Sequence, residues 1–499
     1  MQQRNVTIIR VDGNSTIGGG HVFRCITLAK RLNQHGTKVI FITSDGYAED
    51  LITSSGFTVL NNGGVTAASE KDASHTAEVI ECERASWLIV DGYHFDNLWT
   101  QHVLENCAPV RILRIDDLDQ KAITCDYLLN PTYVGGGKLQ FQVPVIMAGS
   151  EFRVLRNEFY ALRDVSVRNK LLFNGRIKSV VIQPGAFDEI NLVPNVLRAV
   201  KSLNFDSIKV IMSSRSQSLT ETQHLIKHNP IIKLELDATN VAELLADADM
   251  CIGAGGMSSL ERCCLGVPSI NFSVADNQLN VNDSLRQKNA IILGDIKRID
   301  EMGYVPQLVQ ELCDRYRELV ACSQKLVCGD GVQNVVNALC GQLIPVTIHD
   351  CEQVYSWRNH ISTRLGSMNS ASISFAAHEK WFNKAICNTS IRQYFYIEGN
   401  ERLGYVRLQQ VSSEVVSWSF YKNPNAQNKL IGSKMLSNVL HMLLKEGRVL
   451  WVKSIVKVDN QKSLDLHRRL GFELEIAKDD YVSLKRSMQR ESYETSRDI

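Results

Sequence analysis

Arg10-Val-Asp-Gly-Asn-Ser-Thr-Ile-Gly-Gly-Gly-His21-Val-Phe-Arg24 is the stretch that decides the fold. It follows the apolar segment 6–10, which has the composition of a buried strand, and it leads into segment 21–32, where apolar residues recur at helical spacing. Consecutive glycines allow the tight turn that joins a strand to a helix. The stretch therefore predicts the first β–α unit of a parallel sheet.

Short apolar runs and amphipathic stretches continue to alternate up to about residue 340. We expect strands in two series, the first at 6–10, 38–43, 87–91 and 110–116, and the second at 179–183, 207–212, 250–253 and 269–272. The predicted fold class is therefore α/β, with two Rossmann-like halves at residues 1–155 and 156–343. Such sheets bind ligands in a cleft at the carboxyl ends of their strands.

From residue 344 the pattern becomes that of an α+β domain, which we place at 344–490. Strand-like and helical segments follow one another at 393–398, 401–408, 414–421, 431–446, 449–458 and 461–470, with a hairpin turn at Gly399-Asn400. Residues 491–499 are polar, and we expect them to form a frayed tail.

Composition narrows the range of partners. The 499 residues include 55 Lys and Arg against 54 Asp and Glu, which leaves a net charge of +1 and no electrostatic footprint for nucleic acid. No run approaches the ~18 apolar residues of a membrane helix, and the N-terminus lacks a secretory signal. The 13 cysteines show no Cys-x-x-Cys spacing. We therefore expect a cytoplasmic protein without a bound metal, and its oligomeric state stays open.

Polar groups converge at the end of the first expected strand. Backbone N–H groups of the glycine turn, that of Gly20 included, can approach an anionic or sugar ligand at a helix N-terminus. His21 is either a general base near neutral pH or a residue that caps the helix. We expect Asp12 to orient His21 and Arg10 to contact substrate, while Arg24 either contacts substrate or stabilises the loop.

A matching turn lies in the second half. Gly255 and Gly256 lead into a helix that begins near Ser258 and Ser259, where free N–H groups and the helix dipole would hold a pyrophosphate. Glu261 would accept hydrogen bonds from a ribose diol, and the alternative is ordinary helix capping. Two further loops after expected strands carry the candidate substrate-binding residues Asp188, Asn277 and Gln278.

Taken together, these motifs resemble the UDP-sugar hydrolases of the pseudaminic acid pathway over roughly residues 5–340. The matching motifs are Arg10-x-Asp12, Ile17-Gly18-x-Gly20-His21-x-x-Arg24, Asp91-x-Tyr93, Asp116-Asp117, Cys125-Asp126-x-Leu-Leu-Asn130, Gly149-x-x-Phe-x-x-Leu-Arg156, Gly255-Gly256-x-Ser-Ser-x-Glu261 and Asn277-Gln278.

This resemblance implies a GT-B-like arrangement of the two halves. It also implies metal-free removal of UDP from UDP-2,4-diacetamido-2,4,6-trideoxy-β-L-altropyranose. His21 would be the base for a water that inverts the anomeric carbon, and Tyr93 would contact substrate. The family's Gly-Gly-Ser/Thr-Asp loop reads Gly185-Ala-Phe-Asp188 in this chain.

Two segments of the third domain resemble the GNAT acetyltransferases. One, at 427–434, stands where the superfamily binds coenzyme A, and the other is Asn460-x-x-Ser-x-x-x-His467-x-x-x-Gly-Phe. Leu430 replaces the first glycine of the coenzyme A turn. His467 stands where many members place a tyrosine acid, and Tyr481 is the alternative acid. The resemblance implies acetyl-CoA as co-substrate, bound by Gln427, Ile431, Gly432, Ser433 and Asn460.

Trp357-Arg358-Asn359 with His378-x-x-Trp381 resembles, more narrowly, the sugar-nucleotide aminoacetyltransferases of the same pathway. Arg358, His378 and Trp381 are thus candidate contacts to UDP-4-amino-4,6-dideoxy-N-acetyl-β-L-altrosamine, and the last two are alternatively core residues. The resemblances predict a bifunctional enzyme in which acetylation makes the substrate for UDP removal. The alternative is a GT-B glycosyltransferase with a non-catalytic C-terminal module that binds acyl-CoA.

Overall fold

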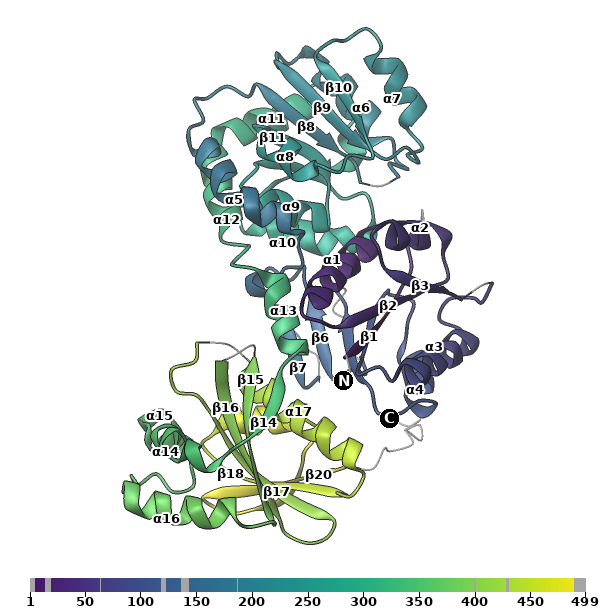
Figure 1. The fold of residues 1–499 in the computed structure, drawn as a ribbon. Coiled ribbons are helices and arrows are strands. Elements are labelled where there is room, and N and C mark those ends of the chain that lie inside the picture. Colours follow the sequence, from purple (N-terminus) through teal and green to yellow (C-terminus); the bar gives the residue numbers. More distant parts are fainter. Residues whose placement is uncertain are drawn as a thin grey trace.

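The computed structural model describes residues 5–13, 19–62, 64–117, 123–135, 143–185, 187–398, 401–427 and 430–488, without the side chain of Asn277. The predicted turn at 399–400 and the predicted tail at 491–499 lie outside these ranges. Three sheets follow one another along the chain (Figure 1). No helix within the described ranges has the length and apolarity needed to cross a bilayer.

The first lobe is a seven-stranded parallel sheet in the order β3-β2-β1-β4-β5-β6-β7. Its strands are β1 (Val6–Val11), β2 (Lys38–Thr43), β3 (Thr58–Asn61), β4 (Trp87–Asp91), β5 (Arg111–Ile115), β6 (Tyr127–Asn130) and β7 (Val145–Ala148). Its helices are α1 (Gly20–Gln34), α2 (Gly46–Ser54), α3 (Glu70–Glu83) and α4 (Asn97–Glu105). Because the strands are parallel, the loops that follow β1, β4 and β5 share one edge.

The second lobe is a six-stranded parallel sheet in the order β10-β9-β8-β11-β12-β13. Its strands are β8 (Ser179–Gln183), β9 (Ser207–Met212), β10 (Ile232–Leu236), β11 (Met250–Ala254), β12 (Ser269–Phe272) and β13 (Ile292–Gly294). Its helices are α5 (Asn157–Leu171), α6 (Leu192–Ala199), α7 (Leu219–Ile226), α8 (Val241–Ala246), α9 (Met257–Cys264), α10 (Leu279–Gln287), α11 (Tyr304–Asp314) and α12 (Tyr316–Gln324). The central strands β8 and β11 are mostly apolar and are buried apart from the partly exposed Ser179, as expected for parallel strands covered on both faces.

Helix α13 (Gly331–Leu339) leaves the second lobe and packs into the core of the first. The Trp87 indole N–H donates to the carbonyl of Leu339 (3.0 Å), and Arg31 pairs with Asp330 (2.7 Å) at the start of the helix. The sequence boundary at residue 343 assigns this helix to the second lobe, whereas its packing ties it to the first.

The third domain has a seven-stranded sheet in the order β14-β15-β16-β17-β18-β20-β19. Its strands are β14 (Gln342–Pro345), β15 (Ile391–Glu398), β16 (Glu401–Gln410), β17 (Val415–Lys422), β18 (Trp451–Lys457), β19 (Glu473–Ala477) and β20 (Tyr481–Ser487). Its helices are α14 (Cys351–Asn359), α15 (Ile361–Gly366), α16 (Phe375–Ile386), α17 (Ile431–Glu446) and α18 (Gln461–Arg469). These three units confirm the predicted two Rossmann-like lobes and the α+β domain.

Helix α17 of the third domain lies against the amino ends of strands in the first lobe (Figure 1). Arg111, the first residue of β5, donates from Nη1 to Oδ1 of Asn438 on α17 (2.7 Å). Leu430, just before α17, packs against the apolar core of the first lobe. The third domain therefore docks on the edge of the first sheet opposite to the loops that follow β1 and β4.

Candidate active sites

His21 lies in the first turn of α1 and is buried, at 4% exposure. Its Nδ1 atom is 2.6 Å from Oδ1 of Asp91, the last residue of β4. An ionised carboxylate only accepts hydrogen bonds, so Nδ1 carries the proton. No described residue hydrogen-bonds Nε2, which is left as the basic nitrogen. This is the geometry of a histidine oriented as a general base.

A buried ionic network holds this pair in place. Arg24 donates to both oxygens of Asp91 (2.6 Å each) and from Nη1 to Asp117 (2.9 Å). Burial opposes ionisation of Asp91, but the charge of Arg24 and the hydrogen bonds from Arg24 and His21 outweigh it and hold the pKa of Asp91 well below its ordinary value. The Tyr93 hydroxyl donates to Asp117, and its ring meets the His21 ring edge-on at 4.9 Å.

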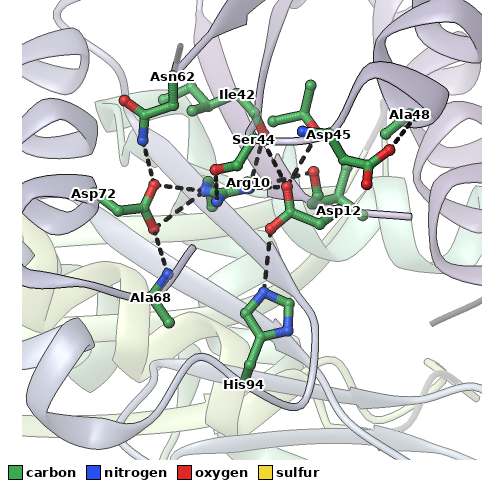
Figure 2. Close-up of polar contacts among 12 residues, drawn as sticks. Arg10, Asp12, Ile42, Ser44, Asp45, Ala48, Asn62, Ala68, Asp72 and His94 are labelled. Carbon is green, nitrogen blue, oxygen red and sulfur yellow. Dashed lines mark hydrogen bonds and ion pairs between the residues drawn. The ribbon is translucent and has the colours of Figure 1, made fainter. Parts of the chain in front are cut away.

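Two predictions for this lobe are corrected, and one open alternative is decided. Asp12 does not orient His21, because its carboxylate is bound by Arg10 and His94 (Figure 2). Asp91 instead occupies the position beside His21. Arg10 has no exposed surface and lies between two carboxylates, so it does not face a ligand. Arg24 is likewise enclosed, which selects the loop-stabilising alternative. Gly20 is exposed at the start of α1.

The turn in the second lobe leaves one helix end open. Gly256, with φ of 84°, precedes α9, and no described side chain caps the helix. Ser258 is partly exposed there, whereas Ser259 is buried and its hydroxyl accepts a hydrogen bond from Asn271 (2.8 Å). The open N–H groups of α9 are suited to an anion, and Ser259 instead stabilises the loop behind them.

A Cβ atom on Gly255 would collide with the side chain of Asn282, so glycine is required where the backbone passes this close to Asn282. The backbone N–H of Gly255 donates to Oε1 of Gln278 (3.1 Å), which also accepts from Val274 (3.1 Å). Gln278 therefore joins two loops of the second lobe. The side chain of Asn277 lies outside the described part.

Glu261 is bound by Arg156 through Nε and Nη2 (3.1 Å each), and burial raises its pKa. Asp188 accepts from two backbone N–H groups at the start of α6 and from the Ser218 hydroxyl. Because both oxygens of Asp188 are engaged and the residue is 6% exposed, its role is to cap α6, which corrects the predicted substrate contact.

The third domain contains an opening between two parallel strands. Strands β17 and β18 pair only from Val415 to Ser417 against 451–453, and no further ladder pair joins them although both continue. Unpaired strand edges present free N–H and C=O groups to an extended ligand. The N-terminus of α17, which begins at Ile431, has no side-chain cap among the described residues.

Leu430 adopts φ of 64°, a left-handed conformation that favours glycine. Ser433 is buried and Gly432 partly exposed in the first turn of α17, while Gln427 is exposed before it. Asn460 accepts from the N–H of Ser463 (3.2 Å) and so caps α18. The structure thus brings the expected coenzyme A turn to an open helix end, but it uses the Asn460 side chain as a cap.

His467 is fully buried among Trp418, Phe420 and Phe472. The Trp418 indole N–H donates to Nε2 (3.1 Å), and Nδ1 donates to the carbonyl of Ser463 (2.7 Å). Burial lowers its pKa to about 4. A neutral ring with both nitrogens engaged cannot donate a proton to a thiolate, so the predicted acid role is corrected. Tyr481 is partly buried at the start of β20 and remains the alternative.

A second group of polar side chains surrounds His378 in the third domain. Its ring lies 5.4 Å from that of Trp381, and Arg407 lies over Trp381 at 5.7 Å. Burial lowers the pKa of His378. Buried nitrogens of Arg358, Arg407 and His378 have no hydrogen-bond partner within the described ranges. Trp381 is 37% exposed, so this group combines unpaired donors with an accessible aromatic face.

Asp91 and Arg407 are the site residues that sequence reasoning missed. Asp91 stands at the end of β4 in the quoted motif with Tyr93, and the order of a parallel sheet that places β4 beside β1 would have brought it to His21. Arg407 has no comparable signal, because a lone arginine in a strand of alternating polarity is indistinguishable from a surface residue.

The C-terminal part matches a known family. Residues 342–473 match the model described as the acetyltransferase (GNAT) domain. The third domain is a GNAT domain. Over the described residues, no group of three or more His, Cys, Asp or Glu side chains is placed to hold a metal ion.

Three similar proteins extend the comparison. The chain is 23% identical over 497 residues to an uncharacterised protein of Methanocaldococcus jannaschii, a match that covers 93% of this chain and 96% of that one. It is 24% identical over 249 residues to the UDP-2,4-diacetamido-2,4,6-trideoxy-β-L-altropyranose hydrolase of Campylobacter jejuni, covering 49% of this chain and 83% of the hydrolase. The crystal structure of Acinetobacter baumannii MurG aligns with a TM-score of 0.46 at 14% identity, covering 67% of this chain and 98% of MurG. The chain is thus a distant homologue of the hydrolase.

Proposed function

We propose that this chain is a bifunctional enzyme of nucleotide-sugar metabolism. Its first two lobes hydrolyse UDP-2,4-diacetamido-2,4,6-trideoxy-β-L-altropyranose, and its GNAT domain acetylates the 4-amino group of UDP-4-amino-4,6-dideoxy-N-acetyl-β-L-altrosamine. The observation that carries the hydrolase proposal is the buried His21–Asp91 pair at the glycine-rich turn, which leaves Nε2 of His21 as a base. Distant homology to a hydrolase of that specificity supports the choice of substrate.

In the hydrolytic step, Nε2 of His21 takes a proton from water as the water oxygen bonds to the anomeric carbon. The bond from that carbon to the diphosphate oxygen breaks, UDP leaves, and the configuration inverts. Asp91 stabilises the imidazolium that forms, since it stays ionised beside it. The open N-terminus of α9, with Gly256 and Ser258, would bind the leaving diphosphate. Glu261, Tyr93, Asn277 and Gln278 remain proposed neighbours of the bound nucleotide sugar.

In the acetyl transfer, the substrate amine attacks the thioester carbonyl of acetyl-CoA and the carbon–sulfur bond breaks. Free backbone N–H groups of β17, beyond its short pairing with β18, would polarise that carbonyl. The open end of α17, at Ile431 and Gly432, would bind the pyrophosphate of coenzyme A. Tyr481 is our proposed proton donor to the departing thiolate, and the proton that the amine nitrogen loses restores the phenol of Tyr481.

The unpaired guanidinium N–H groups of Arg358 and Arg407 beside Trp381 support an anionic, ring-containing acceptor in the GNAT domain. A nucleotide sugar supplies both a diphosphate and rings. Incubation of the chain with acetyl-CoA and the 4-amino substrate tests the pair of reactions. We expect free coenzyme A first and UDP afterwards. Release of coenzyme A without UDP would support the acetyltransferase activity and refute the hydrolase activity. Release of UDP only with an added acceptor would indicate a glycosyltransferase.

A further inference from the structure

The first lobe contains a second histidine–carboxylate pair that the hydrolytic step does not use. Nε2 of His94 lies 3.1 Å from Oδ2 of Asp12 (Figure 2). His94 follows β4 and Asp12 follows β1, so this pair stands on the same edge of two neighbouring strands as the His21–Asp91 pair. The side chain of His94 is 29% exposed, against 3% for Asp12.

The two pairs have the same construction. His21 is held by Asp91, which is held by Arg24 and, behind it, Asp117. His94 is held by Asp12, which is bound by Arg10 (2.7 Å), and Arg10 is in turn bound by Asp72 (3.0 Å). Each row runs from carboxylate to arginine to carboxylate to imidazole. The loop after β1 supplies Asp12 for His94, and β4 supplies Asp91 for His21.

The row behind His94 is buried along its length. Arg10 and Asp72 have no exposed surface, and Asp72 also accepts from Asn62 and from the N–H of Ala68 (Figure 2). The Trp99 indole N–H donates to Asp72 as well (2.9 Å). Taking several charges out of water is costly unless each is paired. The accessible end of this row is the imidazole of His94. Packing alone does not account for a buried row of charges that ends at an accessible imidazole. A ligand contact at His94 does account for it.

The ring of His94 is fixed in one orientation. It packs on Phe95 with 4.1 Å between ring centroids, and a Cβ atom on Gly92 would stand only 2.8 Å from its Cε1. Burial opposes ionisation of Asp12, but the hydrogen bond from His94 and the charge of Arg10 keep the pKa of Asp12 below its usual value. Asp12 therefore fixes the proton on Nε2. No described residue hydrogen-bonds Nδ1, which is left as an acceptor.

We propose that His94 is a substrate-binding residue of the hydrolase site and that its Nδ1 accepts a hydrogen bond from a hydroxyl or amide N–H of the sugar. The sugar must lie on this edge of the first lobe, because the anomeric carbon has to meet the water activated by His21. We assign diphosphate binding to the N-terminus of α9 in the second lobe. The first lobe would then recognise the sugar and the second lobe the diphosphate. This inference rests on the proposed hydrolase function.

The test compares His94→Ala with His102→Ala, a control on α4 of the same lobe whose side chain is 27% exposed beside Ser74. We expect His94→Ala to lower kcat/KM for UDP release by about 10- to 100-fold through a raised KM, measured at a temperature at which both variants are fully folded, while the control matches the wild type. A kcat/KM of His94→Ala within twofold of the wild type would overturn the proposal.

Calorimetric titration separates this inference from the function on which it rests. We expect His94→Ala to bind UDP as the wild type does and to bind the diacetamido nucleotide sugar more weakly. Equal weakening for UDP and for the nucleotide sugar would contradict a sugar contact. A wild type that binds the nucleotide sugar but releases no UDP would refute the hydrolase function, and weaker binding by His94→Ala would still support the contact.

Discussion

Replacing Asp91 by asparagine tests the link between the buried network and the base. The side chain has no exposed surface, accepts two hydrogen bonds of 2.6 Å from Arg24, and meets His21 at 2.6 Å. Asparagine keeps the shape of the side chain but removes the negative charge that stabilises the imidazolium of His21. Its N–H₂ group also replaces one oxygen acceptor and faces an N–H donor of Arg24 or His21. A base that has lost its orientation and counter-charge loses about 10²- to 10⁴-fold in rate.

The same substitution affects folding. Breaking a buried ion pair from one side costs about 3–5 kcal/mol, and because Arg24 keeps Asp117 we expect the lower end, near 3 kcal/mol. For a lobe of this size that corresponds to a melting temperature about 6–12 °C lower. Glu83→Gln is the matched control, because its carboxylate pairs with Lys38 at the surface of the same lobe. There we expect a change of about 0.5 kcal/mol or less.

UDP release should be followed at a temperature at which Asp91→Asn is fully folded by circular dichroism. A folded Asp91→Asn enzyme whose kcat stays within threefold of the wild type would refute the role of Asp91.

Three further predictions address the rest of the chain. His467 is neutral in the folded domain, with a pKa of about 4, but is protonated below about pH 6.5 when unfolded, so stability falls as the pH drops below 6.5. Thermal unfolding at pH 7.5 and pH 5.0 should show that His467→Phe loses about 2 kcal/mol less than the wild type over this interval, and equal losses would contradict the assignment. Arg111 donates to Asn438 across the interface, so Arg111→Ala should weaken docking of the GNAT domain by about 1.5–3 kcal/mol. Faster proteolysis near residue 340 should reveal this, with the partly exposed Arg392→Ala as control, and an unchanged cleavage rate would count against the interface. Because the GNAT domain docks on the amino edge of the first sheet, about 17 Å of five-residue strand separates it from the His21 edge, and the acetylated intermediate should pass through solvent. Excess unlabelled diacetamido nucleotide sugar should then dilute a radioactive acetyl label in the free sugar in proportion to its amount, whereas undiluted label would indicate direct transfer.

Local sequence patterns predicted most of the architecture. The strands at 38–43, 87–91, 179–183 and 207–212 coincide with the observed ones, because parallel strands that are covered on both faces are rich in apolar residues. Short edge strands such as β3 and β13 were missed, since a few apolar residues at a sheet edge carry no distinct period. The packing of α13 against the first lobe depends on tertiary contacts, and no local sequence pattern predicts it.

The sequence predicted which residues lie near the site, but not which of them contact one another. The glycine turn located His21, but Asp12 and Asp91 stand on the same edge and only the strand order decides which of them meets it. His467 stands at the family's acid position, yet the aromatic rings of Trp418, Phe420 and Phe472 close around it. Residues far apart in sequence create that environment, so the motif alone could not reveal that the ring is buried and neutral.

Hydrolysis of the diacetamido nucleotide sugar in ¹⁸O-labelled water, by the wild type and by His21→Ala, tests the central claim most directly. The account predicts that the wild type releases UDP without an added acceptor and that mass spectrometry finds the label in the sugar. His21→Ala should lose about 10²- to 10⁴-fold in rate while keeping its fold. Label in UDP would place the attack at phosphorus, and an active His21→Ala enzyme would remove His21 as the base; either result would contradict the account.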